Sequence, residues 1–83
     1  MSEYKQINVH FYAGDDVFIY NPNTFSKYEI KEEKIAQIIV SDIATTYTTS
    51  NGYTFQDSDI GYTVFKDFYG AAASRRKEVL NEN

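Results

Sequence analysis

The stretch YTFQDSDIGYTVFKDFYGAAASRRK, residues 53–77, decides the fold predicted for this chain. Tyr53 and Phe55 alternate with polar residues, the run at 62–65 is mostly apolar, and an alanine-rich segment follows Asp67. Period-2 alternation and short apolar runs predict strands, and the Asp67 carboxylate can accept hydrogen bonds from the unpaired amides of a first helical turn. The stretch therefore predicts strand, acidic loop, strand and capped helix in succession.

The predicted C-terminal helix has one side that is expected to be buried and a basic end. Arg75-Arg76-Lys77 lies toward its C-terminus, where positive charge complements the helix dipole. One stripe at helical spacing is expected to face the core: Phe68, Ala72, Arg75 and Val79, with Ala71 and Leu80 at its margins.

Alternation also predicts a half-buried strand over residues 7–12. Gly14-Asp15-Asp16 then supplies a turn, because Gly tolerates positive φ and Asp bonds nearby backbone amides. A second strand is expected over residues 17–20, followed by a turn that contains Pro22. The expected product is an N-terminal hairpin.

Residues 31–43 fit both a helix and a strand. Their isoleucines fall at helical spacing behind acidic residues. The β-branched content of residues 38–43 continues into the threonine-rich run at 45–49 and favours the strand. Alternation in that strand puts Ile38 and Val40 on one side and Ile35, Ile39 and Ile43 on the other.

Asn51-Gly52 predicts a hairpin, because a two-residue loop of this composition prefers the type I′ turn. Such a loop pairs Ser50 with Tyr53, Thr49 with Thr54, Thr48 with Phe55 and Tyr47 with Gln56. Tyr53 and Phe55 then share the core face, and Tyr47 points to the other side.

Composition and charge limit the kinds of protein that this sequence can encode. The 83 residues include 8 Tyr and 6 Phe but no Cys and 1 His, which predicts a single domain with an aromatic core, without disulfides or a zinc site. Residues 1–6 and 81–83 are expected to be mobile. The net charge of −4 disfavours non-specific binding to nucleic acid or anionic membrane. The N-terminus lacks a secretory pattern and no apolar run approaches ~20 residues, so a cytoplasmic location is expected.

No motif predicts catalysis, a metal or a cofactor. His10 has no catalytic partner placed around it by a known motif and is expected at the surface. Asp57-Ser58-Asp59 begins like a calcium loop but lacks the acidic residue at the twelfth position. The glycines are isolated, so no phosphate cradle is expected. Catalytic, metal-binding and cofactor-binding residues are therefore expected to be absent, and the protein is expected not to be an enzyme.

Several motifs between residues 14 and 80 resemble those of short uncharacterised proteins from bacteriophages and low-GC Gram-positive bacteria. They are Gly-Asp-x-Val at 14–17, an isoleucine-rich strand at 35–40, Tyr47 with Tyr53, Ile-Gly-x-Thr-Val-Phe at 60–65 and an alanine-rich helix at 71–80. The resemblance implies an α+β fold, in which a small bent antiparallel sheet or partly open β-barrel is closed by one C-terminal helix. It implies no activity.

Protein recognition is the function expected once catalysis and phosphate binding are set aside. An acidic, tyrosine-rich surface suits a partner with a basic groove, such as a nucleic-acid-processing enzyme. The expected contact residues are Asp15, Asp16, Asp57 and Asp59, in place of phosphates, with Tyr47 as an apolar anchor. The expected role is a non-enzymatic phage or mobile-element accessory protein that binds and inhibits a host or defence-system protein.

Two alternatives stay open at the level of sequence. Tyr12, Tyr20, Tyr47 and Tyr62 on a curved sheet would form a stacking platform for single-stranded nucleic acid, although Arg75-Arg76-Lys77 is the only basic cluster in the sequence. A free sheet edge would instead produce a self-associating structural protein.

Overall fold

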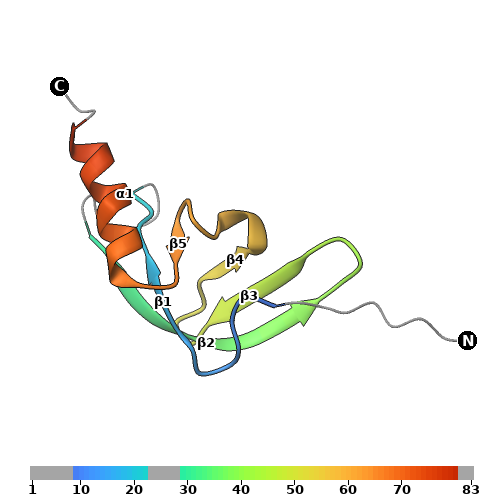
Figure 1. The fold of residues 1–83 in the computed structure, drawn as a ribbon. Helices are drawn as coiled ribbons and strands as arrows, with labels where there is room; N and C mark the ends of the chain where they lie inside the picture. Colours follow the sequence, from blue (N-terminus) through green and yellow to red (C-terminus); the bar gives the residue numbers. More distant parts are fainter. Residues whose placement is uncertain (1–8, 23–28, 81–83) are drawn as a thin grey trace, which may run out of the picture.

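The sheet is built around its longest strand, β2 (Lys31–Val40) (Figure 1). The computed structural model describes residues 9–22 and 29–80. The other elements are β1 (Asp16–Ile19), β3 (Thr45–Thr49), β4 (Thr54–Gln56), the 3₁₀-helix η1 (Asp57–Asp59), β5 (Val64–Phe65) and the helix α1 (Phe68–Leu80). The strand order is β4-β3-β2-β1-β5, and every neighbouring pair is antiparallel. The predicted α+β fold, a bent antiparallel sheet with one C-terminal helix, is confirmed.

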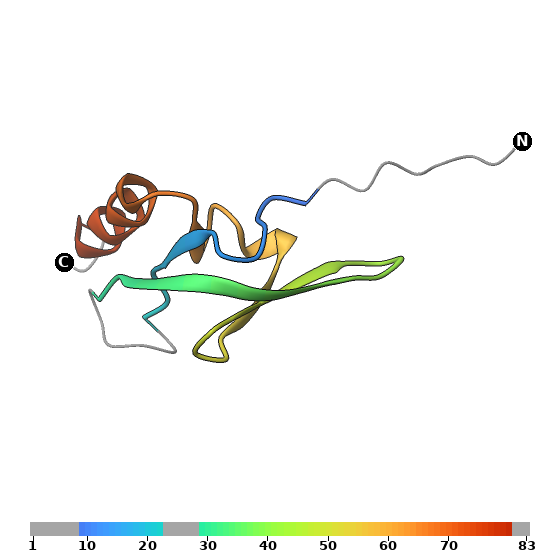
Figure 2. The same cartoon turned by 90° about the horizontal axis from the view of Figure 1, so that it is seen from below.

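Strand β2 joins the two halves of the sheet, because its first part pairs with β1 and its second part with β3. The interpretation of this segment as a strand is confirmed. It ends at Val40, where the Ser41 N–H donates to the Ala44 carbonyl at 2.9 Å and the chain turns back. The predicted continuation through Ile43 is therefore wrong. Figure 2 shows α1 at one end of β2 and the β2–β3 hairpin extending from the other.

A β-bulge in β2 changes the predicted orientation of the side chains in its second half. Ile35 and Gln37 pair with successive residues of β3, so β2 carries one extra residue between them. An extra residue interrupts strict alternation and moves the following side chains to the opposite face. Ile35 is buried and Ile38 packs against the same core, whereas Ile39 is exposed. The predicted grouping of Ile35 with Ile39 is therefore wrong.

The β3–β4 hairpin is shifted by one residue from the predicted register, since Tyr47 pairs with Phe55. The Gly52 N–H donates to the Thr49 carbonyl at 2.9 Å, and the Thr49 N–H donates to the Tyr53 carbonyl at 2.8 Å. With Gly52 at a φ of 90°, these bonds close a three-residue loop that ends in a glycine bulge, instead of the predicted two-residue loop. The shift places Tyr47 beside Phe55 in the core.

Residues 9–12 do not form the predicted strand. Strand β1 pairs with β2 on one edge and with β5 on the other, so neither edge of β1 accepts an N-terminal partner and the predicted N-terminal hairpin is wrong. The predicted turn is confirmed at Gly14, which has a φ of 93°. It allows Phe11 to enter the core, where it is buried. The ends expected to be mobile, and the turn residues after Pro22, lie outside the described residues.

The two faces of β1 contribute to two apolar clusters. The buried members of the main core are Phe11, Val17, Ile19, Ile35, Tyr47, Phe55 and Val64. A smaller cluster on the other face joins the sheet to α1 through Tyr20, Phe65 and Ala71. Strand β5 is shorter than predicted, since residues 62 and 63 form a turn. The sheet is therefore covered on both faces at its β1–β5 end.

Helix α1 approaches the sheet through its smallest residues. The Asp67 Oδ1 atom accepts a hydrogen bond from the Gly70 N–H at 2.8 Å, which confirms the predicted cap. Ala71 is fully buried, and a Cβ atom at Gly70 would lie 3.0 Å from the Phe65 ring. The predicted buried stripe is wrong, since its first member, Phe68, is 46% exposed. The Phe65 ring fills the space below the helix, so only small side chains fit against it.

We expect Gly52→Ala to destabilise the fold by about 1–2 kcal/mol, because a φ of 90° is unfavourable for a residue with a Cβ atom. Urea unfolding followed by circular dichroism measures this change. Ser50→Ala is the matched control in the same loop: it keeps the bond from the Ser50 N–H to the Lys34 carbonyl and should cost less than about 0.5 kcal/mol. Equal losses from the two substitutions would contradict the role of Gly52.

We expect Ala71→Leu to cost about 1–3 kcal/mol, because it overpacks the contact between α1 and Phe65. Ala73→Leu, at an exposed position of the same helix, should leave the free energy of unfolding nearly unchanged. Thermal unfolding of the two variants measures the difference. The reverse order of stability would show that the helix packs through a different side.

Candidate functional site

The four carboxylates predicted to contact a partner lie on two separate elements. Asp15 and Asp16 lie at the start of β1, and Asp57 and Asp59 lie in η1. The first pair borders a pocket of about 230 Å³ whose lining residues are His10, Phe11, Asp15, Asp16 and Lys66. Neither aspartate of η1 lines that pocket. The structure therefore brings the carboxylates together as pairs and does not gather all of them in one pocket.

These carboxylates make local bonds within the fold. The Asp15 Oδ2 atom accepts from the Tyr12 N–H at 2.8 Å and closes the turn before β1. The Lys34 ammonium donates to Asp16 Oδ1 at 2.7 Å across β1 and β2, and this hydrogen bond raises the pKa of Lys34. The Asp59 Oδ2 atom accepts from the backbone N–H at the N-cap of η1 at 3.0 Å. Asp15 and Asp59 thus stabilise turns, and Asp16 stabilises the pairing of β1 with β2.

Tyr47, the predicted apolar anchor, is fully buried. Its ring stacks on Phe55 with centroids 5.0 Å apart and meets the edge of Phe11 at 5.6 Å. Its hydroxyl accepts from the His10 N–H at 3.0 Å and donates to Asp57 Oδ1 at 2.9 Å. The expectation that Tyr47 points away from the core is wrong, because the register shift turns its side chain inward.

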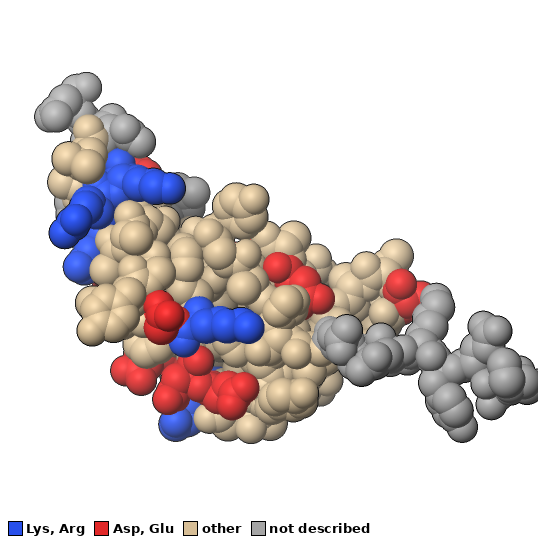
Figure 3. Space-filling model, viewed as in Figure 1, with Lys and Arg blue, Asp and Glu red and all other residues tan. Residues whose placement is uncertain are grey.

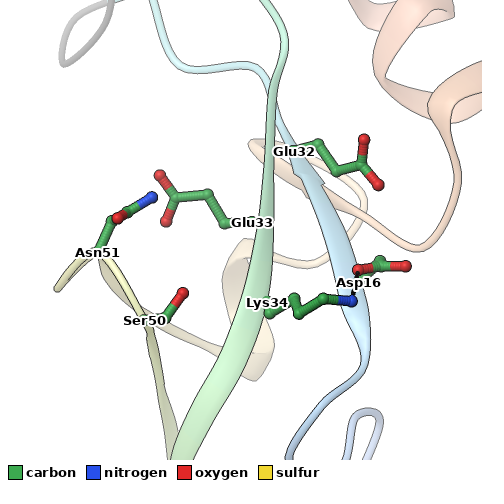
Figure 4. Close-up of a pocket in the computed structure, with 6 residues that line it drawn as sticks. All are labelled: Asp16, Glu32, Glu33, Lys34, Ser50 and Asn51. Carbon is green, nitrogen blue, oxygen red and sulfur yellow. Dashed lines mark hydrogen bonds and ion pairs between the residues drawn. The ribbon is translucent and has the colours of Figure 1, made fainter.

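The pocket shown in Figure 4 contains a buried carboxylate that was not predicted as a site residue. Its volume is about 290 Å³, and its lining residues are Asp16, Glu32, Glu33, Lys34, Ser50 and Asn51. Glu33 is buried and accepts a hydrogen bond from the Thr49 hydroxyl, whose oxygen accepts from the Tyr53 N–H at 3.1 Å. Figure 4 shows the Glu33 side chain pointing toward the loop that carries Asn51. Glu33 therefore links β2 to the β3–β4 hairpin. The sequence signal for its burial is its position two residues before Ile35, because residues i and i+2 of a strand lie on the same face.

Residues 9–22 and 29–80 contain neither a cluster of metal-binding side chains nor a membrane-spanning helix. Within these ranges, no group of three or more His, Cys, Asp or Glu side chains has an arrangement that could hold a metal ion. No helix in the same part of the chain has the length and apolar character needed to cross a membrane. The side chain of His10 is exposed, as predicted.

The stacking platform predicted for single-stranded nucleic acid does not form as expected. Tyr12 and Tyr62 are 66% and 77% exposed, but Tyr20 and Tyr47 are buried in the two apolar clusters. Figure 3 shows Lys and Arg side chains gathered over α1 and several Asp and Glu side chains over the β1–β2 part of the sheet. The tyrosines that remain accessible therefore do not form the four-residue platform.

Three exposed aliphatic residues lie on the hairpin formed by β2 and β3, which we call the β2–β3 arm (residues 37–48). Ile39 is 50% exposed, Val40 43% and Ile43 94%. Isolated exposed apolar residues are ordinary, but a group on a projecting element is a candidate interaction surface. Figures 1 and 2 show that this hairpin extends beyond the body of the sheet. The sequence pattern missed this surface, because it placed these residues within a longer strand.

The turn at the end of the β2–β3 arm is held by a serine side chain. The Ser41 hydroxyl donates to the Ala44 carbonyl at 2.9 Å and accepts from the Ala44 N–H at 3.2 Å. These bonds close the connection that carries Asp42 and Ile43. The arm is therefore preorganised, and its exposed aliphatic residues keep a defined arrangement without a partner.

The raised pKa of Tyr47 leads us to expect a loss of stability in alkaline solution. Burial of the hydroxyl is the largest cause of this shift, and the bond to Asp57 acts in the same direction. The unfolded tyrosine, with an ordinary pKa of 10.0, releases its proton before the folded one, so the free energy of unfolding falls as pH rises above about 10. Tyr47→Phe should weaken this pH dependence and should cost about 1–3 kcal/mol near neutral pH through lost hydrogen bonds.

Urea unfolding at a series of pH values measures both effects of Tyr47→Phe. Tyr62→Phe is the control, because that side chain is 77% exposed and should change neither the stability nor its pH dependence. An alkaline dependence of equal size in the wild-type protein and Tyr47→Phe would contradict the assignment.

Comparison with known proteins adds no family to these observations. No protein-family model, curated protein or solved structure matches this chain.

Proposed function

We propose that this protein is a non-enzymatic protein-binding module that docks its partner through the β2–β3 arm. The resemblance to short bacteriophage and Gram-positive proteins supports a more specific proposal. The protein would be a cytoplasmic phage or mobile-element accessory protein that binds and inhibits a host or defence-system protein. The observation that carries the docking proposal is the exposure of Ile39, Val40 and Ile43 on one projecting, preorganised hairpin.

The physical basis for docking is the burial of apolar surface. Complete burial of one aliphatic side chain of this size contributes about 1.5–3 kcal/mol, and Ile43 is 94% exposed in the free protein. The bonds made by Ser41 hold the tip of the arm, so little conformational entropy is lost on binding. An apolar cleft on the partner that accepts the tip would therefore be a favourable site.

The negative charge of this protein favours a partner whose binding cleft is bordered by basic groups. The net charge of the chain is −4, and Asp42 lies next to Ile43 at the tip of the arm. A negative field speeds association with a positively charged partner and disfavours acidic competitors. A nucleic-acid-processing enzyme has the required basic character. In this proposal the exposed carboxylates of Asp15 and Asp16 contribute to the field, and the arm makes the direct apolar contact.

The proposal is tested by affinity capture from a nuclease-treated lysate of a Gram-positive host, with mass spectrometry of the retained proteins. We expect the tagged wild-type protein to retain one protein in stoichiometric amount. Ile43→Asp should reduce its retention at least about tenfold, which corresponds to about 1.4 kcal/mol of binding free energy. The substitution should not unfold the protein, because Ile43 is 94% exposed.

Tyr62→Ser is the matched control for capture, since Tyr62 is also highly exposed but lies outside the arm. It should retain the partner as the wild-type protein does. Equal retention by Ile43→Asp and the wild-type protein would contradict docking through the arm. If proteins were retained from an untreated lysate but none from the nuclease-treated lysate, nucleic-acid binding would be favoured instead.

A further inference from the structure

The outward side of α1 carries a second apolar surface, which we call the α1 groove. It has a volume of about 210 Å³ and is lined by Tyr69, Ala72, Ala73 and Arg76. The alanines leave a shallow floor, and Tyr69, which is 82% exposed, borders it. Apolar residues with a charged residue at the border suit a ligand that carries an aliphatic group next to an opposite charge.

The tip of the β2–β3 arm has this composition. Ile43 is 94% exposed and follows Asp42, whose side chain is also exposed. The groove offers Arg76 at its border, within the basic run that includes Arg75 and Lys77. A tip that places Ile43 over the alanine floor would bring an aspartate toward an arginine. The two surfaces of the same chain are thus complementary in both polarity and charge.

The positions of the two surfaces exclude a contact within one molecule. Figures 1 and 2 show α1 at one end of the fold and the β2–β3 arm at the other, with the sheet between them. The tip can therefore reach only the groove of another copy. Such a contact joins two different surfaces, leaves one tip and one groove free, and permits further copies to add.

We propose that copies of this protein associate head to tail, with Ile43 of one copy inserted in the α1 groove of the next and Asp42 of the first copy paired with Arg76 of the second. The inference rests on the proposed function in one respect, because the same tip would dock the host partner. Self-association then covers the arm until the partner competes for it. The contact involves one hairpin tip, so association is weak and depends on concentration.

Sedimentation equilibrium of the purified chain measures this association. The mean mass of the wild-type protein should rise with concentration above the monomer mass of 9.6 kDa. Ile43→Asp removes the tip and Arg76→Asp removes the basic border of the groove, so each variant alone should remain a monomer. An equimolar mixture of the two should form a heterodimer of twice the monomer mass and nothing larger, because one intact tip meets one intact groove.

A charge exchange tests the pairing directly. Asp42→Arg alone should weaken association, and the double variant Asp42→Arg with Arg76→Asp should restore it, since the opposite charges still face each other. Ala73→Leu, which fills the groove without changing charge, should also weaken association. Failure of the double variant to recover association, together with unchanged association of Ala73→Leu, would overturn the assigned contact.

The outcomes also separate this inference from the proposed function. A wild-type protein that remains monomeric at all concentrations, or a variant mixture that remains monomeric, would overturn head-to-tail association. If Arg76→Asp then also abolished host-protein capture, the groove would bind a foreign acidic protein rather than a second copy. Failure to capture any host protein would refute the proposed function and leave the mass measurements, which use only the purified chain, unaffected.

Discussion

The Tyr47 side chain connects segments that are far apart in the sequence, and the rest of the fold depends on its position. Its ring packs against both Phe11 and Phe55, and its hydroxyl bonds to the His10 N–H and to Asp57. A buried hydroxyl without partners would cost about 1–3 kcal/mol, so these bonds must form together with the core. The N-terminal segment, the register of the β3–β4 hairpin and the position of η1 are therefore mutually dependent.

Two single-residue irregularities in the sheet bring about this arrangement. The bulge after Ile35 turns Ile38 toward the core and leaves Ile39 exposed, and the Gly52 loop pairs Tyr47 with Phe55. Because side chains alternate along a strand, an offset of one residue exchanges the buried and exposed faces. The bulge that turns Ile38 toward the core therefore also leaves Ile39 exposed on the β2–β3 arm.

The fold places the two surfaces proposed for binding at opposite ends and uses most of the predicted site residues for structure. Asp15 and Asp59 satisfy backbone amides, Asp16 pairs with Lys34, and Asp57 accepts from Tyr47. Helix α1 packs through its smallest residues, which leaves larger apolar side chains on its outward side. The surfaces proposed for binding are thus the arm and the α1 groove. In the sequence, the apolar residues of these surfaces could not be told apart from residues of the hydrophobic core.

Local chemistry in the sequence determined the existence and type of most described elements: strands at β1, β4 and β5, the turn at Gly14, and a helix capped by Asp67. For β2 it favoured a strand but left a helix open. Turn and cap preferences act over a few residues, so they can be recognised without the rest of the chain. The tertiary structure alone decided the register of the β3–β4 hairpin, the face of each isoleucine in β2, and the absence of strand at residues 9–12, the described part of the strand expected over residues 7–12. It also decided which apolar residues stay exposed and so where the candidate site lies. These outcomes depend on competition between strand pairings and on the fit of large rings such as Tyr47 and Phe65, which involve residues distant in the sequence.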